Sequence, residues 1–117
     1  MTRDIWFLRA AIAFTLVFSA ALVWAFLTPI AQLPKVPDIS DYVWHIAIFA
    51  VLVIPLCTIL PAQRIFLVGS AIAFGIILEI LQPYFGRGFE IHDLASNVLG
   101  VGLGWLASRK LAAIVER

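Results

Sequence analysis

The polar residues that could carry chemistry gather in one stretch of this sequence, residues 79–104 (EILQPYFGRGFEIHDLASNVLGVGLG). Glu79 and Gln82 are three residues apart, and Asp93 and Asn97 are four apart, so each pair shares one face of a helix. Arg87 lies between the two pairs and is flanked by glycines. A polar group that faces hydrocarbon costs roughly a few kcal/mol, and this density of polar groups in an apolar chain therefore predicts a site.

The residue types at this site are suited to proton transfer and to binding an anion. Carboxylates and histidine exchange protons with substrates, so the candidate catalytic residues are Glu79, Asp93 and His45. A planar guanidinium matches phosphate or carboxylate, and amides orient a ligand or a water, so the candidate ligand-binding residues are Arg87, Gln82, Asn97 and Asp41. No nucleophilic serine or cysteine motif accompanies them.

Two other interpretations of the same residues stay open. A metal ion is one, because His45, Glu79, Asp93 and Asn97 are competent ligands, but their spacing matches no recognised metal signature and we predict no metal site. A structural clasp is the other, in which Arg87 pairs with Glu79 or Asp93, and His45 bonds to Asp41 or Asn97. Interhelical hydrogen bonds in membranes contribute about 0.6–2 kcal/mol each. The sequence names no cofactor.

The rest of the chain is composed to hold this stretch in a membrane. Its 117 residues are 63% hydrophobic and 13% charged, with a mean hydropathy of +1.06, whereas a soluble domain is roughly 45–50% apolar. At about 20 residues per crossing, there is room for four transmembrane helices, which we predict at residues 5–28, 41–60, 65–82 and 94–113. We therefore expect a single domain over residues 1–117, an all-α four-helix transmembrane bundle. No basic stripe lies outside the helix ends, which excludes nucleic-acid binding.

Two local patterns refine this prediction. The first apolar segment follows Arg3 and Arg9, as in a signal peptide, but it is longer than the roughly 7–15 apolar residues of such a peptide. We therefore interpret it as a helix that stays in the membrane.

In the fourth segment, Gly100 and Gly104 form a Gly-x-x-x-Gly pair that follows Asn97. Small residues at this spacing predict the close approach of another helix.

The basic residues predict the orientation of the bundle. Six of the eight lie at the termini and in the central turn, and two lie in the other loops. The first group is Arg3, Arg9, Arg64, Arg109, Lys110 and Arg117, and the second is Lys35 and Arg87. Under the positive-inside rule, both termini are cytoplasmic, and the polar pocket opens to the outer face of the cytoplasmic (inner) membrane. Helix rise places Glu79 about 22 Å from Arg64, within a ~30 Å hydrocarbon layer.

The ordered set of polar residues resembles the VanZ-like family of small bacterial membrane proteins, over residues 41–104. That family has an acidic residue before a His-x-x-x-aromatic turn, then Glu-x-x-Gln, an arginine, and an aspartate, asparagine and glycine at fixed spacing. The matching residues here are Asp41, His45, Phe49, Glu79, Gln82, Arg87, Asp93, Asn97 and Gly100. Tyr42 departs from the pattern, since a lysine commonly follows the aspartate in the family.

The resemblance implies a role in the cell envelope, since the founding member is associated with resistance to the glycopeptide antibiotic teicoplanin. We therefore expect an outward-facing pocket that binds or processes an anionic, lipid-linked or peptidoglycan-related envelope ligand. Whether the protein is an enzyme stays open. The alternative is a non-enzymatic accessory or binding membrane protein whose polar residues form the interhelical clasp. A homo-oligomer or a complex with another membrane protein is compatible with either function.

Overall fold

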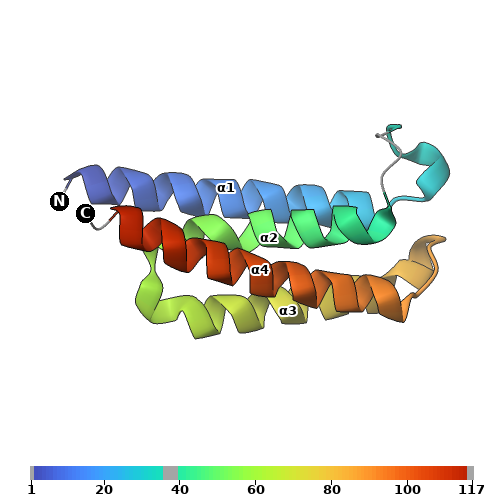
Figure 1. Cartoon of the computed structure of the whole chain (residues 1–117). Coiled ribbons are helices and arrows are strands. Elements are labelled where there is room, and N and C mark those ends of the chain that lie inside the picture. Colours follow the sequence, from blue (N-terminus) through green and yellow to red (C-terminus); the bar gives the residue numbers. More distant parts are fainter. Residues whose placement is uncertain (1, 36–39, 116–117) are drawn as a thin grey trace.

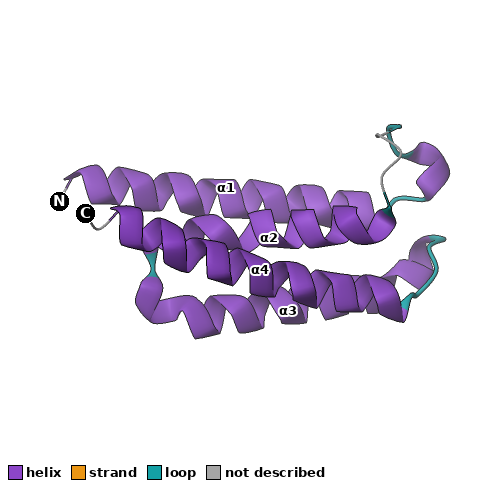
Figure 2. Ribbon diagram, in the orientation of Figure 1, coloured by secondary structure: helices purple, strands orange, loops and turns teal. Residues whose placement is uncertain are grey.

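The computed structural model describes residues 2–35 and 40–115, and Arg117, one of the basic residues counted above, lies outside this description. The described ranges form four α-helices and no strand, which confirms the predicted all-α four-helix class (Figures 1 and 2). The helices are α1 (Thr2–Phe26), α2 (Asp41–Ile59), α3 (Arg64–Leu81) and α4 (Ile91–Val115). Short 3₁₀ turns follow the first three of them, at Ile30–Gln32, Pro61–Gln63 and Gln82–Phe85.

All four helices are long and apolar enough to cross a membrane. Large apolar side chains cover much of the outer surface, among them Val17, Ile65 and Phe66, which are 71%, 90% and 73% exposed. An apolar surface of this extent is unfavourable in water and suits contact with lipid. The fold is therefore that of a multi-pass membrane protein.

The helix ends differ from the predicted ones by a few residues. α1 stops at Phe26, before the predicted end, because Thr28 precedes Pro29 and a residue before proline is disfavoured in the α conformation. α4 starts at Ile91, three residues before the predicted start. The carbonyl of Glu90 accepts the N–H groups of Asp93 at 3.2 Å and Leu94 at 3.3 Å, which begins the helix early. Asp93 therefore lies in the first helical turn, where a carboxylate is favoured.

α2 and α4 pack against each other closely enough for their backbones to touch. A Cβ atom on Gly104 would come within 2.6 Å of the Ala50 carbonyl oxygen and 2.5 Å of a Val53 methyl group, and one on Gly100 would collide with the Ile46 carbonyl. Only glycine fits at such distances. The close approach sets the register in which α4 presents Asp93 and Asn97 to α2.

The apolar core lies beside the polar residues rather than around them. Phe49 on α2 is completely buried, and its ring lies 6.0 Å from that of Phe26 on α1. Gly75 on α3 makes room for it, since a Cβ there would be 3.1 Å from the Phe49 ring. His45 is one turn away from Phe49 along α2. The polar cluster is thus sealed on one side by packed aromatic rings.

The two ends of the bundle have different character. In Figure 1 the start of α1 and the end of α4 lie together at one end, and the connections that follow α1 and α3 lie at the other. His45 is near the start of α2, Glu79 near the end of α3 and Asp93 near the start of α4. All three therefore lie toward the end that holds the connections after α1 and α3, which we call the loop end of the bundle.

Candidate functional site

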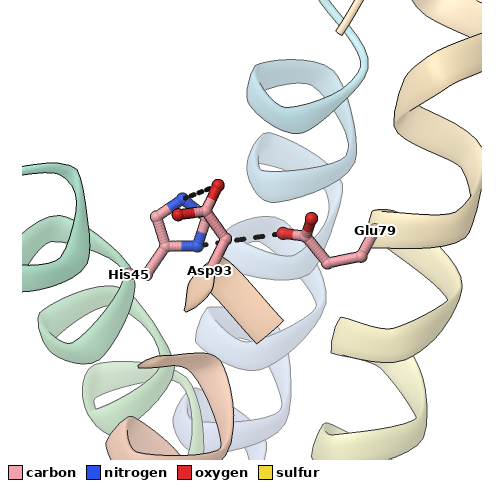
Figure 3. A group of neighbouring side chains, drawn as sticks. All are labelled: His45, Glu79 and Asp93. Atoms are coloured by element: carbon pink, nitrogen blue, oxygen red, sulfur yellow. Dashed lines mark ion pairs between the residues drawn. The ribbon is translucent and has the colours of Figure 1, made fainter. Parts of the chain in front are cut away.

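Three helices bring His45, Glu79 and Asp93 together (Figure 3). The two carboxylates lie beside the His45 imidazole: its Nδ1 is 4.0 Å from Glu79 Oε1 and its Nε2 is 3.8 Å from Asp93 Oδ2. His45 is 7% exposed and Glu79 is completely buried, while the Asp93 side chain is 14% exposed. The three predicted catalytic residues therefore form one cluster, which we call the His45 cluster.

Asn97 fixes the imidazole from below Asp93 on α4. His45 Nδ1 lies 2.7 Å from Asn97 Oδ1. A carbonyl oxygen only accepts hydrogen bonds, so Nδ1 carries a proton and donates a hydrogen bond to Asn97 Oδ1. In the neutral ring, Nε2 is then the nitrogen with a free lone pair, and it lies 3.8 Å from Asp93 Oδ2. The pairing of His45 with Asn97 is also one of the two contacts that a clasp would use.

The cluster contains more polar atoms than its hydrogen bonds satisfy. Seven buried side-chain polar atoms in the described chain have no hydrogen-bond partner, and five of them belong to the predicted site residues. The five are both carboxylate oxygens of Glu79, Oδ1 of Asp93, Oε1 of Gln82 and Nδ2 of Asn97. The Asn97 amide and the Glu90 backbone N–H face Glu79 without reaching hydrogen-bond geometry. Buried groups are normally paired, so the arrangement is incomplete as it stands.

Gln82 and Arg87 hold the end of α1 instead of joining the His45 cluster. Gln82 Nε2 donates to the Phe26 carbonyl at 3.1 Å. Arg87 Nη1 donates to the carbonyls of Ala25 at 3.0 Å and Thr28 at 3.1 Å. The last carbonyls of a helix lack intrahelical donors and carry partial negative charge, so a guanidinium stabilises them. The predicted contact of Arg87 with an anionic ligand stays a prediction.

Asp41 is exposed at the first position of α2 and lies outside the His45 cluster. Phe26, in contrast, belongs to the site although its sequence context did not single it out. Its ring lies 5.0 Å from the His45 ring, and its carbonyl accepts from Gln82. An aromatic residue within a long apolar run carries no local signal of such a role.

Two grooves open elsewhere on the molecule, and neither is lined by the His45 cluster. The larger, of about 780 Å³, lies at the opposite end of the bundle, between residues such as Asp4, Pro55 and Val115. The smaller, of about 210 Å³, lies beside Leu52, Ser70 and Phe74. Both are lined mainly by apolar groups and offer few side chains for polar chemistry. The chemistry of the molecule is therefore concentrated in the closely packed cluster.

The cluster is equipped for proton exchange and for holding a cation, since it combines one imidazole nitrogen with two carboxylates in a largely dehydrated place. Comparisons of the chain with protein-family models, curated proteins and solved structures found no match. The function is therefore inferred from the geometry of this site and from the ordered set of polar residues between Asp41 and Gly100.

Proposed function

We propose that this is a VanZ-like protein of the cell envelope whose polar end binds or processes an anionic, lipid-linked ligand. The protein lies in the cytoplasmic membrane with both termini in the cytoplasm, as the distribution of basic residues favours. The loop end, with the His45 cluster, then faces outward at the level of the lipid headgroups. A ligand anchored in the outer leaflet would meet the cluster there.

The observation that carries this proposal is the unsatisfied state of the His45 cluster. Both oxygens of the fully buried Glu79 lack a hydrogen-bond partner, as does Oδ1 of Asp93. A cluster retained only to fix the helices would be expected to pair these groups, because an unpaired buried polar group costs about 1–3 kcal/mol. Unpaired carboxylate oxygens accept hydrogen bonds, so they suit the hydroxyl or amide donors of such a ligand rather than its anionic group.

A structural clasp is the second candidate, and specific contacts favour it for part of the set. Gln82 and Arg87 donate hydrogen bonds to backbone carbonyls at the end of α1. These bonds join α1 to the connection between α3 and α4. The polar residues thus divide by function: Gln82 and Arg87 join helices, while Glu79, Asp93 and His45 form the candidate site.

Thermal stability of the purified protein tests the proposal. We expect a lipid-phosphate headgroup or a peptidoglycan stem peptide to raise the melting temperature of the wild type but not of Glu79→Gln. Glu90→Gln is the matched control, because Glu90 is an exposed carboxylate in the adjoining loop, and it should respond as the wild type does.

Arg87→Ala separates the two candidate functions. A clasp predicts a lower melting temperature for this variant without any ligand. If no ligand stabilises the wild type while Glu79→Gln and Arg87→Ala both melt early, the polar set is a clasp and the binding proposal is wrong. Expression of the protein in a susceptible bacterium, followed by the teicoplanin dose response, tests the link to glycopeptide resistance.

A further inference from the structure

The spacing within the His45 cluster does not match direct bonding between its members. One ring nitrogen of His45 and one carboxylate oxygen each from Glu79 and Asp93 lie within 4.8 Å of one another. The two closest nitrogen–oxygen separations, 3.8 Å and 4.0 Å, are too long for hydrogen bonds. Figure 3 shows the three side chains converging from different helices, with Asp93 overlapping the imidazole and Glu79 reaching toward it from one side.

The charge of the cluster is also uncompensated at short range. Among the side chains that the structure describes, no lysine or arginine nitrogen lies within 4.0 Å of the Glu79 or Asp93 carboxylate. Arg87 acts on Glu79 only through space, because its Nη1 is bonded to the end of α1. With a neutral His45 ring, the buried Glu79 and the largely buried Asp93 carboxylates have no close cation, which is costly. A bound cation would offset that cost.

The hydrogen bond from His45 to Asn97 prepares the imidazole for such a cation. With Nδ1 donating to Asn97 Oδ1 at 2.7 Å, Nε2 of the neutral ring has a lone pair and lies 3.8 Å from Asp93 Oδ2. Histidines that bind metals almost always donate the other ring N–H to a fixed acceptor, which sets the tautomer and orients the ring. Asn97, which is 2% exposed, is a rigid acceptor of that kind.

We propose that His45 Nε2, Glu79 and Asp93 bind one divalent transition-metal ion, of the class of Zn²⁺ or Mn²⁺. An imidazole nitrogen with carboxylate oxygens suits these ions, whereas Mg²⁺ and Ca²⁺ prefer all-oxygen sites. Metal–ligand bonds of about 2.0–2.2 Å place neighbouring donors about 3.4 Å apart. Asp93 Oδ2, 3.8 Å from Nε2, needs only a small shift, whereas Glu79 Oε1, 4.0 Å from Nδ1, must move along the ring toward Nε2. The proposal depends on these three side chains and on Asn97, and not on the envelope ligand proposed above.

Three protein ligands leave at least one coordination position open, as in catalytic zinc sites. A water or an anionic group of a ligand would occupy it. The ion would also satisfy the carboxylate oxygens that otherwise lack partners. One bound ion thus explains both the unpaired carboxylate oxygens of Glu79 and the orientation of the His45 ring by Asn97.

The test is metal binding by the whole chain, purified in detergent without a histidine tag, stripped with a chelator and titrated calorimetrically without lipid. We expect saturable binding of one Zn²⁺ or Mn²⁺ per chain, and none of Mg²⁺ or Ca²⁺ at the same concentration. His45→Gln and Glu79→Gln should abolish it, and Asn97→Ala should weaken it about 10–100-fold as an outer-shell change. His92→Gln and Glu90→Gln, which alter exposed residues of the same types, should bind as the wild type does.

A measurement on native protein guards against variants that fail to fold. Electron paramagnetic resonance of bound Mn²⁺ should show coupling to one imidazole nitrogen, and His92→Gln should retain that coupling. Absence of saturable Zn²⁺ and Mn²⁺ binding by the wild type would overturn the proposal, as would bound Mn²⁺ without imidazole coupling. Because no lipid is present, these outcomes leave the proposed envelope ligand to be decided by its own experiment.

Discussion

Asn97 is the residue on which the orientation of His45 depends. Its Oδ1 accepts from His45 Nδ1 at 2.7 Å across the α2–α4 interface. Replacing Asn97 with leucine keeps the number of side-chain heavy atoms but leaves the Nδ1–H unpaired, so we expect the free energy of unfolding to fall by about 1–3 kcal/mol. The ring should also lose its single tautomer, which ¹⁵N chemical shifts of the imidazole report.

Ser96 provides the control for this prediction. It is the neighbouring residue on α4, and its hydroxyl donates to the His92 carbonyl of the same helix at 2.8 Å. Because that bond joins no second helix, Ser96→Ala should leave both the stability and the His45 tautomer nearly unchanged. Equal melting temperatures and equal ¹⁵N shifts for Asn97→Leu and wild type would contradict the assigned contact.

The sequence predicted the grouping of His45, Glu79 and Asp93, but not the separate contact of Gln82 with α1. Glu79 and Gln82 share a helical face, as their spacing indicates, yet Gln82 reaches the Phe26 carbonyl while Glu79 turns to His45. That division depends on where α1 ends, which is a tertiary fact. Likewise, His45, Glu79 and Asp93 come from three different helices, so no local spacing could reveal a metal signature.

At the scale of elements, the contact between α2 and α4 should be the most sensitive to added volume. A Cβ atom on Gly104 would lie 2.6 Å from the Ala50 carbonyl oxygen, a backbone atom that cannot rotate away. Gly104→Ala should therefore push the helices apart and lower the free energy of unfolding by about 1–3 kcal/mol, the usual cost of overpacking. Unfolding of detergent-solubilised protein by heat or by SDS measures this change.

Gly102 is the matched control on the same helix. A Cβ there would meet nothing within 4 Å, and alanine is favoured over glycine in a helix interior by up to about 1 kcal/mol. Gly102→Ala should thus be neutral or stabilising. If Gly104→Ala were as stable as Gly102→Ala, the close approach of α4 to α2 would be wrong.

Element positions were the easiest feature to predict, because long apolar runs separated by prolines define them. The errors fall at the ends. Pro29 cuts α1 short at Phe26, and α4 begins at Ile91 because backbone bonds to Glu90 form before the apolar run starts. Hydropathy does not register those bonds. The order and number of helices were unaffected.

At the scale of the whole molecule, the two ends of the bundle make a prediction about topology. The start of α1 and the end of α4 lie at the same end of the bundle (Figure 1), and the positive-inside rule assigns that end to the cytoplasm. We expect a cysteine placed at Gly88, in the exposed connection before α4, to react with a membrane-impermeant maleimide in intact cells. A cysteine placed at Gln63, in the exposed turn between α2 and α3, should react only after the cells are permeabilised.

The native chain is its own control for this labelling, since Cys57 is its single cysteine and is completely buried. The reverse pattern would place the His45 cluster at the cytoplasmic face, where a lipid-linked ligand of the outer leaflet could not reach it, and the proposed envelope function would be wrong. The proposed metal site would survive such a result, because its three ligands and Asn97 lie on helices that keep their packing in either orientation. Topology and metal binding are therefore independent tests. Cysteine labelling reports how the molecule lies in its membrane, and the metal titration reports the chemistry within the bundle.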